Sequence, residues 1–402
     1  MKQGIIAGLG LVLVGLALQV VVGPIDWSLM NWPVNAIVLA LLAVIAVMLH
    51  VGMRWFKPLQ SLSSGKMAVA ALLWTAAMTL VMGLTRQSGS PAAHHTLGQL
   101  LGIHHCLSWW PFVLIYVWLT MVLALVVLRR LGRFSTRRDI PFLLSHAGLL
   151  VVLMCATLGN ADLQRLQMTV TYDQPEWRAT DESGQVHELP VAIELLDFTI
   201  NEYPPKLLVI DTGSGQPLPV GNPEVLLLDS AFTASTLQGH TVRLVQVLDK
   251  AQPVMSEDTT AYEPWHMTGA TTAVLVDVDG QHHWLSTGSY MFPPQTLQLN
   301  DRQSLAVPPR EPQRYVSTVE IMTESGKHLK TDILVNRPVT VDGWKIYQLN
   351  YDTRMGRWSD ISVLELVRDP WLPAVYTGIV MMLVGAVLML FTSQPRKEGA
   401  AQ

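Results

Sequence analysis

The sequence predicts an α-helical membrane protein with six transmembrane helices and an all-β, sandwich-like domain outside the membrane. Three observations predict this class. Half of the 402 residues are hydrophobic and only 14% are charged, whereas an ordinary soluble protein carries about 25% charged residues. Six stretches reach or approach the about 20 apolar residues that a bilayer-crossing helix needs. The charge is also divided, because residues 161–370 hold 15 basic and 28 acidic residues and the rest holds 12 basic and 3 acidic ones.

The chain therefore divides into an apolar, basic part and an acidic, water-soluble part. We expect two extra N-terminal transmembrane helices (1–66), a three-helix transmembrane core (67–160), the β domain (161–370), and a last helix with a short cytoplasmic tail (371–402). The low charge content excludes a disordered chain, and a net charge of −4 gives no basic footprint for binding nucleic acid.

The predicted spans, in chain order, are Ile5–Val22, Val34–Met53, Met67–Leu84, Trp109–Leu128, Ile140–Leu158 and Trp371–Phe391. The first has a basic flank at Lys2, as a signal peptide does. Its apolar run is longer than that of a signal peptide, and no A-x-A cleavage site follows it. We therefore expect it to remain as an uncleaved span.

Basic residues in the short loops predict the orientation of these spans. The alternate loops, 23–33 and 85–108, carry only Arg86. Eleven basic residues lie in the other set of loops and at the termini: Lys2, Arg54, Lys57, Lys66, Arg129, Arg130, Arg133, Arg137, Arg138, Arg396 and Lys397. Because basic loops stay in the cytoplasm, we expect both termini to be cytoplasmic and residues 161–370 to lie outside.

The outer segment has the residue pattern of strands. The pairs Asp279-Gly280, Ser325-Gly326 and Asp342-Gly343 are turn signals between apolar runs. No long helical period interrupts those runs, so two packed antiparallel sheets are expected. The runs are Leu166–Tyr172, Val191–Ile200, Leu207–Ile210, Thr241–Val247, Thr272–Val278, Val316–Ile321, Lys330–Val335, Lys345–Asn350 and Ile361–Val367.

His146 is the side chain within the spans that most strongly suggests chemistry. It lies about six residues, or about 9 Å, inside the fifth span, and ionisable residues at such depth are candidates for function. Its neighbours Ser145, Ala147 and Gly148 are small, which leaves room for a flat ligand such as haem but also suits close helix packing. Two interpretations are therefore open: a haem-iron ligand, or a neutral histidine hydrogen-bonded to a neighbouring helix.

His50 ends the second span on the same side, and Arg54 follows one turn later. One hypothesis makes this pair a second haem site, with His50 on the iron and Arg54 meeting a propionate. The alternative is a side chain that extends to the membrane interface.

The other histidines and the cysteines indicate less. His94, His95, His104 and His105 crowd one outer loop, but their spacing does not match a regular metal site, and we expect a solvated loop or interfacial helix. Cys106 and Cys155 form no C-x-x-C and are expected to be buried. No P-loop, H-E-x-x-H or G-x-S-x-G occurs, which argues against an autonomous hydrolase or NTPase.

Three stretches together resemble the ResB/CcsB family of membrane proteins for cytochrome c assembly. The first is Phe142-Leu-Leu-Ser-His146-Ala-Gly148-Leu149, preceded by Ser108-Trp-Trp-Pro-Phe112. The second runs from Glu188-Leu-Pro190 through Leu195-Leu-Asp-Phe198 to Glu202-Tyr-Pro-Pro-Lys206. The third runs from Asn336-Arg-Pro338 through Asp342-Gly343, Ile346-Tyr-Gln348, Tyr351 and Ser359 to Val367-Arg-Asp-Pro370. The resemblance covers roughly residues 67–392, so the first two spans are extra.

The resemblance implies a role in system II cytochrome c biogenesis, in the bacterial inner membrane with a periplasmic β domain. With a CcsA-type partner, such proteins carry haem b outward and present it to apocytochrome c. It also implies that His146 is the transmembrane haem ligand. The chain lacks the tryptophan-rich loop of CcsA, so it is expected to be a subunit of a haem lyase that is not active alone. Two alternatives stay open: a non-catalytic scaffold that binds apocytochrome or braces the partner, and a sensor or adhesion protein with a multispan anchor.

Overall fold

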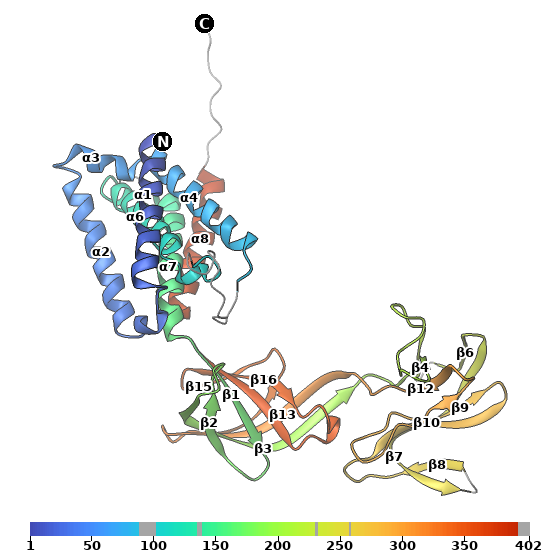
Figure 1. The fold of residues 1–402 in the computed structure, drawn as a ribbon. Coiled ribbons are helices and arrows are strands. Elements are labelled where there is room, and N and C mark those ends of the chain that lie inside the picture. Colours follow the sequence, from blue (N-terminus) through green and yellow to red (C-terminus); the bar gives the residue numbers. More distant parts are fainter. Residues whose placement is uncertain (88–101, 135–138, 230–231, 257–258, 393–402) are drawn as a thin grey trace. The chain divides into compact units, whose positions relative to one another are not determined.

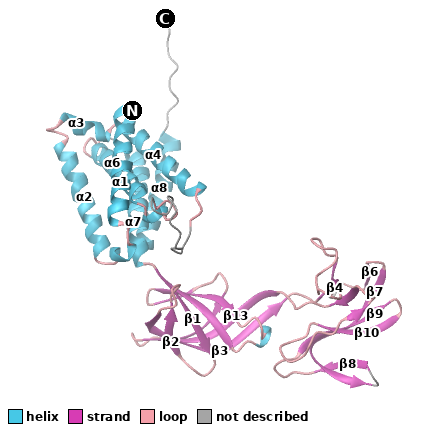
Figure 2. Ribbon diagram, in the orientation of Figure 1, coloured by secondary structure: helices cyan, strands magenta, loops and turns pink. Residues whose placement is uncertain are grey.

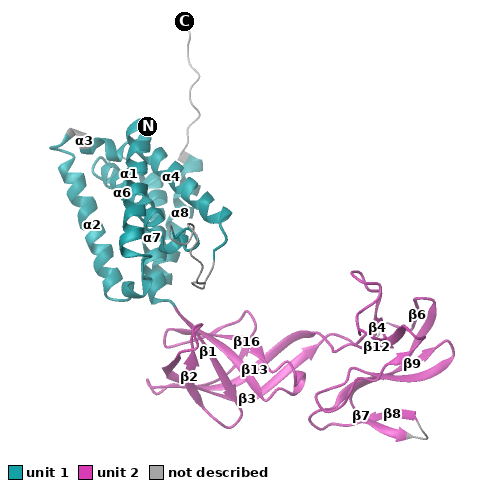
Figure 3. Ribbon diagram, viewed as in Figure 1, with its two compact units in different colours: residues 1–163, 369–402 teal, residues 164–368 magenta. Residues whose placement is uncertain are grey.

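The computed structural model describes residues 1–87, 102–134, 139–229, 232–256 and 259–392. They form two compact units, which are coloured separately in Figure 3. Residues 1–163 and 369–402 make up the first unit, and residues 164–368 make up the second. Figure 2 shows that long helices belong to the first unit and strands to the second.

Within the described residues, the first unit contains six helices long and apolar enough to span a membrane, as predicted. Each one begins and ends within three residues of the predicted span. The spans are α1 (Lys2–Val22), α2 (Val34–Gly52), α4 (Gly65–Leu84), α6 (Trp110–Leu131), α7 (Asp139–Gly159) and α8 (Leu372–Thr392), which Figure 1 shows as one bundle. Short helices connect or follow them: η1 (Trp27–Met30), α3 (Lys57–Gln60), η2 (Ser61–Ser63), η3 (Cys106–Ser108) and η4 (Asn160–Asp162).

Small residues let the helices of the bundle approach closely. A Cβ added to Gly148 on α7 would stand 2.6 Å from the carbonyl oxygen of Gly378 on α8. A Cβ added to Gly385 would stand 2.5 Å from the backbone nitrogen of Ser145. Because lipid tails are as apolar as leucine, such close backbone packing is a main source of helix association in a membrane.

The carboxylate of Asp162, directly after α7, joins three helices at one end of the bundle. It accepts hydrogen bonds from the Trp32 backbone N–H at 2.7 Å, from Asn35 Nδ2 at 2.8 Å and from Trp371 Nε1 at 2.6 Å. Trp32 and Asn35 lie at the start of α2, and Trp371 lies just before α8. The contacts therefore fix α2, α7 and α8 relative to one another.

The second unit contains only strands and one short helix, η5 (Gly356–Trp358), among its described elements. An eight-stranded antiparallel sheet has the order β14-β13-β3-β2-β1-β17-β16-β15. A five-stranded sheet has the order β10-β9-β7-β6 with β8 beside β7, and a four-stranded sheet has the order β11-β12-β4-β5. The strands of the large sheet are β1 (Gln164–Thr171), β2 (Glu176–Thr180), β3 (Val186–Glu202), β13 (Pro312–Thr323), β14 (His328–Leu334), β15 (Val339–Val341), β16 (Trp344–Tyr351) and β17 (Ile361–Arg368). The other strands are β4 (Lys206–Asp211), β5 (Val225–Leu227), β6 (Ala234–Leu237), β7 (His240–Ser256), β8 (Thr259–Pro264), β9 (Thr271–Val278), β10 (Gln281–Ser286), β11 (Leu297–Gln298) and β12 (Gln303–Ala306).

Two larger hydrophobic cores and a small cluster around Ala251, Tyr262 and Ala273 stabilise these sheets. The larger sheet buries alternate residues of its strands, such as Met168, Ile193 and Trp344, in a core of its own. The two smaller sheets share a second core, to which Leu207 and Leu305 come from one sheet and Val274 from the other. The all-β antiparallel architecture is confirmed, and the described strands are distributed over three sheets whose two larger cores are separate.

The predicted turn signals lie between paired strands. Asp279-Gly280 joins β9 to β10, Ser325-Gly326 joins β13 to β14, and Asp342-Gly343 joins β15 to β16. Asp279 and Gly280 have φ of 53° and 90°. Positive φ at both central residues is the geometry that a two-residue hairpin turn requires.

Candidate functional site

His146 lies on α7 with its imidazole held in one orientation. Nδ1 lies 2.9 Å from the carbonyl oxygen of Phe142, one turn earlier on the same helix. The Phe142 ring stacks on the imidazole, with the centroids 3.8 Å apart and the planes 21° apart. Because a carbonyl oxygen can only accept, Nδ1 carries the proton and the lone pair of the neutral ring lies on Nε2. Nε2 makes no hydrogen bond to any described residue.

This arrangement bears on both interpretations of His146. The imidazole bonds to its own helix, and within the described residues it makes no hydrogen bond to a neighbouring one. A metal-ligating histidine commonly donates its other N–H to a backbone carbonyl, which sets the tautomer and aims the free nitrogen at the metal. The imidazole therefore has the tautomer that an Nε2 ligand needs.

The small residues beside His146 serve helix packing. Gly148 and Ser145 lie against the backbone of α8. The sequence allows these small residues either to make room for a flat ligand or to let helices pack closely, and the structure shows close packing. The room for a flat ligand lies elsewhere on α7. An apolar hollow of about 230 Å³ lies between α2, α6 and α7, and Leu150 and Met154 line it at successive four-residue steps from His146. Ligand pockets usually measure about 300 Å³ or more, so a haem there would need further walls from a partner or from lipid.

His50 and Arg54, predicted as a second pair, do lie together. Both line a polar cavity of about 430 Å³ at the ends of α2 and α6. The lining is completed by Met53, Gln60, Ser63, Arg129, Gly132 and Arg133. His146 is not part of this lining, so the structure does not bring the two predicted histidines into one cavity.

The remaining candidates show no metal site. Within the described residues, no three histidine, cysteine or acidic side chains are grouped closely enough to hold a metal ion. His94 and His95 lie outside the described residues, and His104 Nδ1 lies 3.0 Å from the carbonyl oxygen of Arg86. Cys106 and Cys155 are free and buried, as expected.

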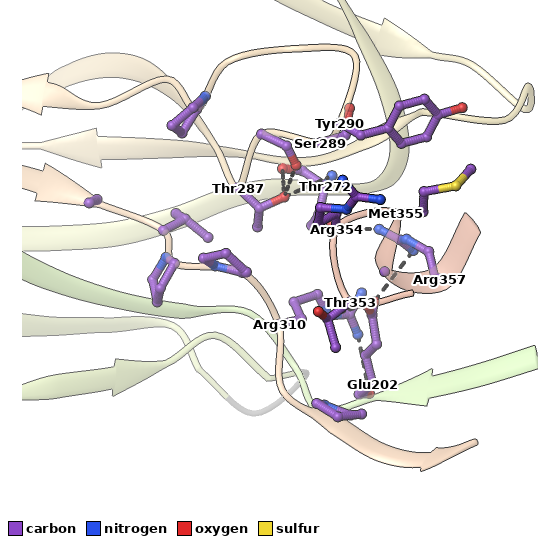
Figure 4. Close-up of a pocket in the computed structure, with 18 of the residues that line it drawn as sticks. Glu202, Thr272, Thr287, Ser289, Tyr290, Arg310, Thr353, Arg354, Met355 and Arg357 are labelled. Carbon is purple, nitrogen blue, oxygen red and sulfur yellow. Dashed lines mark hydrogen bonds and ion pairs between the residues drawn. The ribbon is translucent and has the colours of Figure 1, made fainter. Parts of the chain in front are cut away.

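The second unit contains a cavity of about 650 Å³, shown in Figure 4. Buried charges form one wall. The Glu202 carboxylate at the end of β3 lies 3.6 Å from a nitrogen of Arg310 and 3.6 Å from a nitrogen of Arg357. Arg310 also pairs with Asp249 at 2.8 Å, and Arg357 donates to the Asp249 carbonyl oxygen at 2.8 Å and to the Thr272 hydroxyl. These bonds connect β3, β7 and β9 to Arg310, just before β13, and to Arg357 in η5.

Burial is the main influence on the pKa of Arg357. It lowers the pKa of the Arg357 guanidinium below its ordinary value, while the Glu202 carboxylate acts in the opposite direction. The side chains of Arg310, Arg357 and Glu202 are only 13%, 18% and 14% exposed. Sequence reasoning missed this cluster because Glu202 and Arg310 are 108 positions apart and because charged residues in a β domain ordinarily lie in solvent. The one local signal is the Pro308-Pro309-Arg310 run before β13.

These features define a multi-pass helical membrane protein with a large antiparallel β unit inserted before its last span. Comparison with protein-family models matches residues 267–360 to the ResB-like family. This match supports membership of the ResB/CcsB family, and the matched segment includes Arg310, Arg357 and much of the remaining wall of the large cavity. Most of the third resembling stretch lies in the matched segment, and the first two lie outside it. No curated protein matches the chain significantly.

Proposed function

We propose that this chain is the ResB/CcsB half of a complex that carries haem across the inner membrane and presents it to apocytochrome c. The family match suggests involvement in cytochrome c biogenesis. Six apolar helices suit a subunit that moves a flat, apolar cargo through lipid. The β unit would then act outside the membrane, in the periplasm, where apocytochrome c receives its haem.

The haem assignment rests on the tautomer and the orientation of the His146 imidazole. Its Nδ1–H is bound to the Phe142 carbonyl and its ring is stacked on Phe142, so Nε2 is left as an oriented lone pair. Neutral imidazole with a free nitrogen is a common haem-iron ligand. The apolar hollow between α2, α6 and α7, which Leu150 lines one helical turn after His146, would offer the ring of haem b a surface that excludes water.

In this proposal the chain holds and orients the haem but takes no part in the bond-forming reaction. The covalent step, addition of the two C-x-x-C-H thiols to the haem vinyl groups, belongs to the haem and the apocytochrome. Because the ResB-like family named by the match works in a membrane complex, a CcsA-type partner is expected to complete the site. The subunit would thus belong to a haem lyase without being active alone.

The experiment is the absorption spectrum of the purified complex with His146→Ala, together with cytochrome c maturation in cells. We expect the variant to insert normally, because alanine removes a polar group from lipid, and to lose both haem and maturation. His104→Ala is the matched control, since this imidazole lies outside the spans and binds only the Arg86 carbonyl among the described residues. If His146→Ala retains haem and maturation, the ligand assignment is wrong and His50 with Arg54 becomes the pair to test.

A scaffold without haem is the second candidate, and one observation favours it. The large cavity of the β unit is lined in good part by the segment that matches the family, which suggests that this surface contributes to the shared role. A scaffold would brace the partner or bind apocytochrome through the β unit. A colourless preparation that still co-purifies with a CcsA-type partner would support it against the haem proposal.

A further inference from the structure

The polar cavity at the ends of α2 and α6 contains more positive charge than the protein neutralises. Arg54, Arg129 and Arg133 line it together with His50. None of these three arginines forms an ion pair with any described residue. Among the described residues, Arg129 donates to Ser63 alone, to the carbonyl at 3.2 Å and to the hydroxyl at 3.3 Å.

Among the described residues, no carboxylate near the cavity compensates this charge. Residues 1–160 include only two acidic side chains, Asp26 and Asp139. Asp26 precedes α2, at the opposite end of that helix, which is about 28 Å long. Asp139 pairs with Arg130, which does not line the cavity. The C-terminal ends of α2 and α6 offer only about half a negative charge each, so roughly two positive charges remain.

His50 adds a hydrogen-bond donor to the same cavity. Its Nδ1 is buried and has no hydrogen-bond partner among the residues that the structure describes. A buried N–H without a partner is rarer than an unpaired acceptor, so the proton belongs on Nε2. Nε2 lies beside Gly132, at 3.7 Å from the place where a Cβ on that residue would stand.

The lining favours a compact, hydrated anion over a large apolar ring. Six of the eight lining residues are polar or charged, and the other two are a methionine and a glycine. A haem macrocycle needs apolar walls, whereas phosphate oxygens need N–H and O–H donors, which these residues supply. The loop count also predicts that this end of the bundle lies at the cytoplasmic membrane surface, where basic pockets between helices bind anionic headgroups.

We propose that the cavity formed by His50, Arg54, Arg129 and Arg133 binds a phosphate-bearing anion, and that in the membrane this anion is the headgroup of an acidic phospholipid. Arg129 and Arg133, from the end of α6 and the residues after it, and Arg54, after α2, hold the phosphate oxygens. The ligand thereby joins two helices at the end opposite to the Asp162 contacts. This inference does not depend on haem binding.

Titration of the purified full-length protein with lipid in an uncharged detergent, with bound lipid counted by native mass spectrometry, tests this proposal. The probes are phosphatidylglycerol, phosphatidylethanolamine and inorganic phosphate. We expect one phosphatidylglycerol to bind in preference to phosphatidylethanolamine. Arg129→Gln should weaken its binding about fivefold, since a basic residue near the surface contributes about 1 kcal/mol toward an anionic lipid.

Two further variants make the test specific to the cavity. Lys66→Gln, at the start of α4, removes a positive charge outside the cavity that forms no ion pair with a described residue, and it should leave binding within twofold. Gly132→Leu leaves the charge unchanged and fills the cavity, so it should abolish preferential binding. Equal losses in Arg129→Gln and Lys66→Gln, or full binding by Gly132→Leu, would overturn the site. Saturation by millimolar inorganic phosphate without any effect of lipid would overturn the headgroup assignment.

Discussion

At the scale of single residues, Glu202 balances two buried arginines that would otherwise repel each other. Glu202→Gln leaves Arg310 and Arg357 without their shared carboxylate, and the side chains are too buried for solvent to screen them well. Removing one partner of a buried ion pair costs about 3 kcal/mol or more. We therefore expect the β unit to unfold at lower urea concentration, measured on the full chain by pulse proteolysis. Glu311→Gln is the control, because Glu311 pairs with Lys206 while 64% exposed and should cost less than about 1 kcal/mol. Equal effects of the two substitutions would contradict the role given to Glu202.

His146 and Gly148 show what a sequence reveals about single residues and what it leaves open. The depth of His146 in an apolar run marks it as unusual, and this depth can be predicted from the neighbouring sequence alone. Gly148 could make room for a ligand or for a neighbouring helix, and the sequence leaves both purposes open. The answer depends on α8, which lies more than 220 positions later in the chain. The structure places Gly378 of α8 against it. The tautomer of His146 depends on the Phe142 carbonyl, which is visible only when the side chain is placed.

At the scale of elements, the α7–α8 pair depends on glycines that meet backbone to backbone. A Cβ added to Gly378 would stand 2.8 Å from the Gly148 oxygen and 2.8 Å from a methyl carbon of Val152. Gly378→Val should therefore separate the helices, at a cost of about 1–3 kcal/mol from overpacking. The measurement is the temperature at which the full chain in detergent loses its monodisperse elution peak.

The control for that substitution lies in α1. Gly10 has nothing within 4 Å of its added Cβ, so Gly10→Val should leave the transition temperature nearly unchanged. If the two valine variants lose their elution peak at the same temperature, the packing role of Gly378 is refuted.

The helices and turns were predictable because their signals are local. A run of about 20 apolar residues can satisfy its backbone in lipid only as a helix or a closed barrel, and the six observed spans match the predicted ones. Asp279-Gly280 marks its own hairpin turn because both residues tolerate positive φ. The division into three sheets was not predictable, because strand partners such as β1 and β17 are almost 200 positions apart in the chain.

At the scale of the whole molecule, the uneven charge predicts which side of the membrane each part occupies. The eleven-to-one bias of basic residues in the loops predicts cytoplasmic termini. A reporter that works only in the cytoplasm should be active when it is fused after Gln402 or within residues 129–138, and silent when fused near Asp279. Activity at Asp279 would reverse the predicted arrangement, including the cytoplasmic position of the anion cavity.

The most direct test of the central claim, that His146 Nε2 binds haem iron, is chemical rescue of His146→Gly. The substitution leaves a space the size of an imidazole beside Phe142, and a small free ligand can occupy the vacated coordination position. The measurement is the haem absorption spectrum of the purified complex as imidazole is added. We expect little haem without imidazole, recovery of the native haem spectrum as its concentration rises, and no such dependence for the native chain. A His146→Gly complex that holds normal haem without imidazole, or that never recovers haem at normal protein level, would contradict the claim.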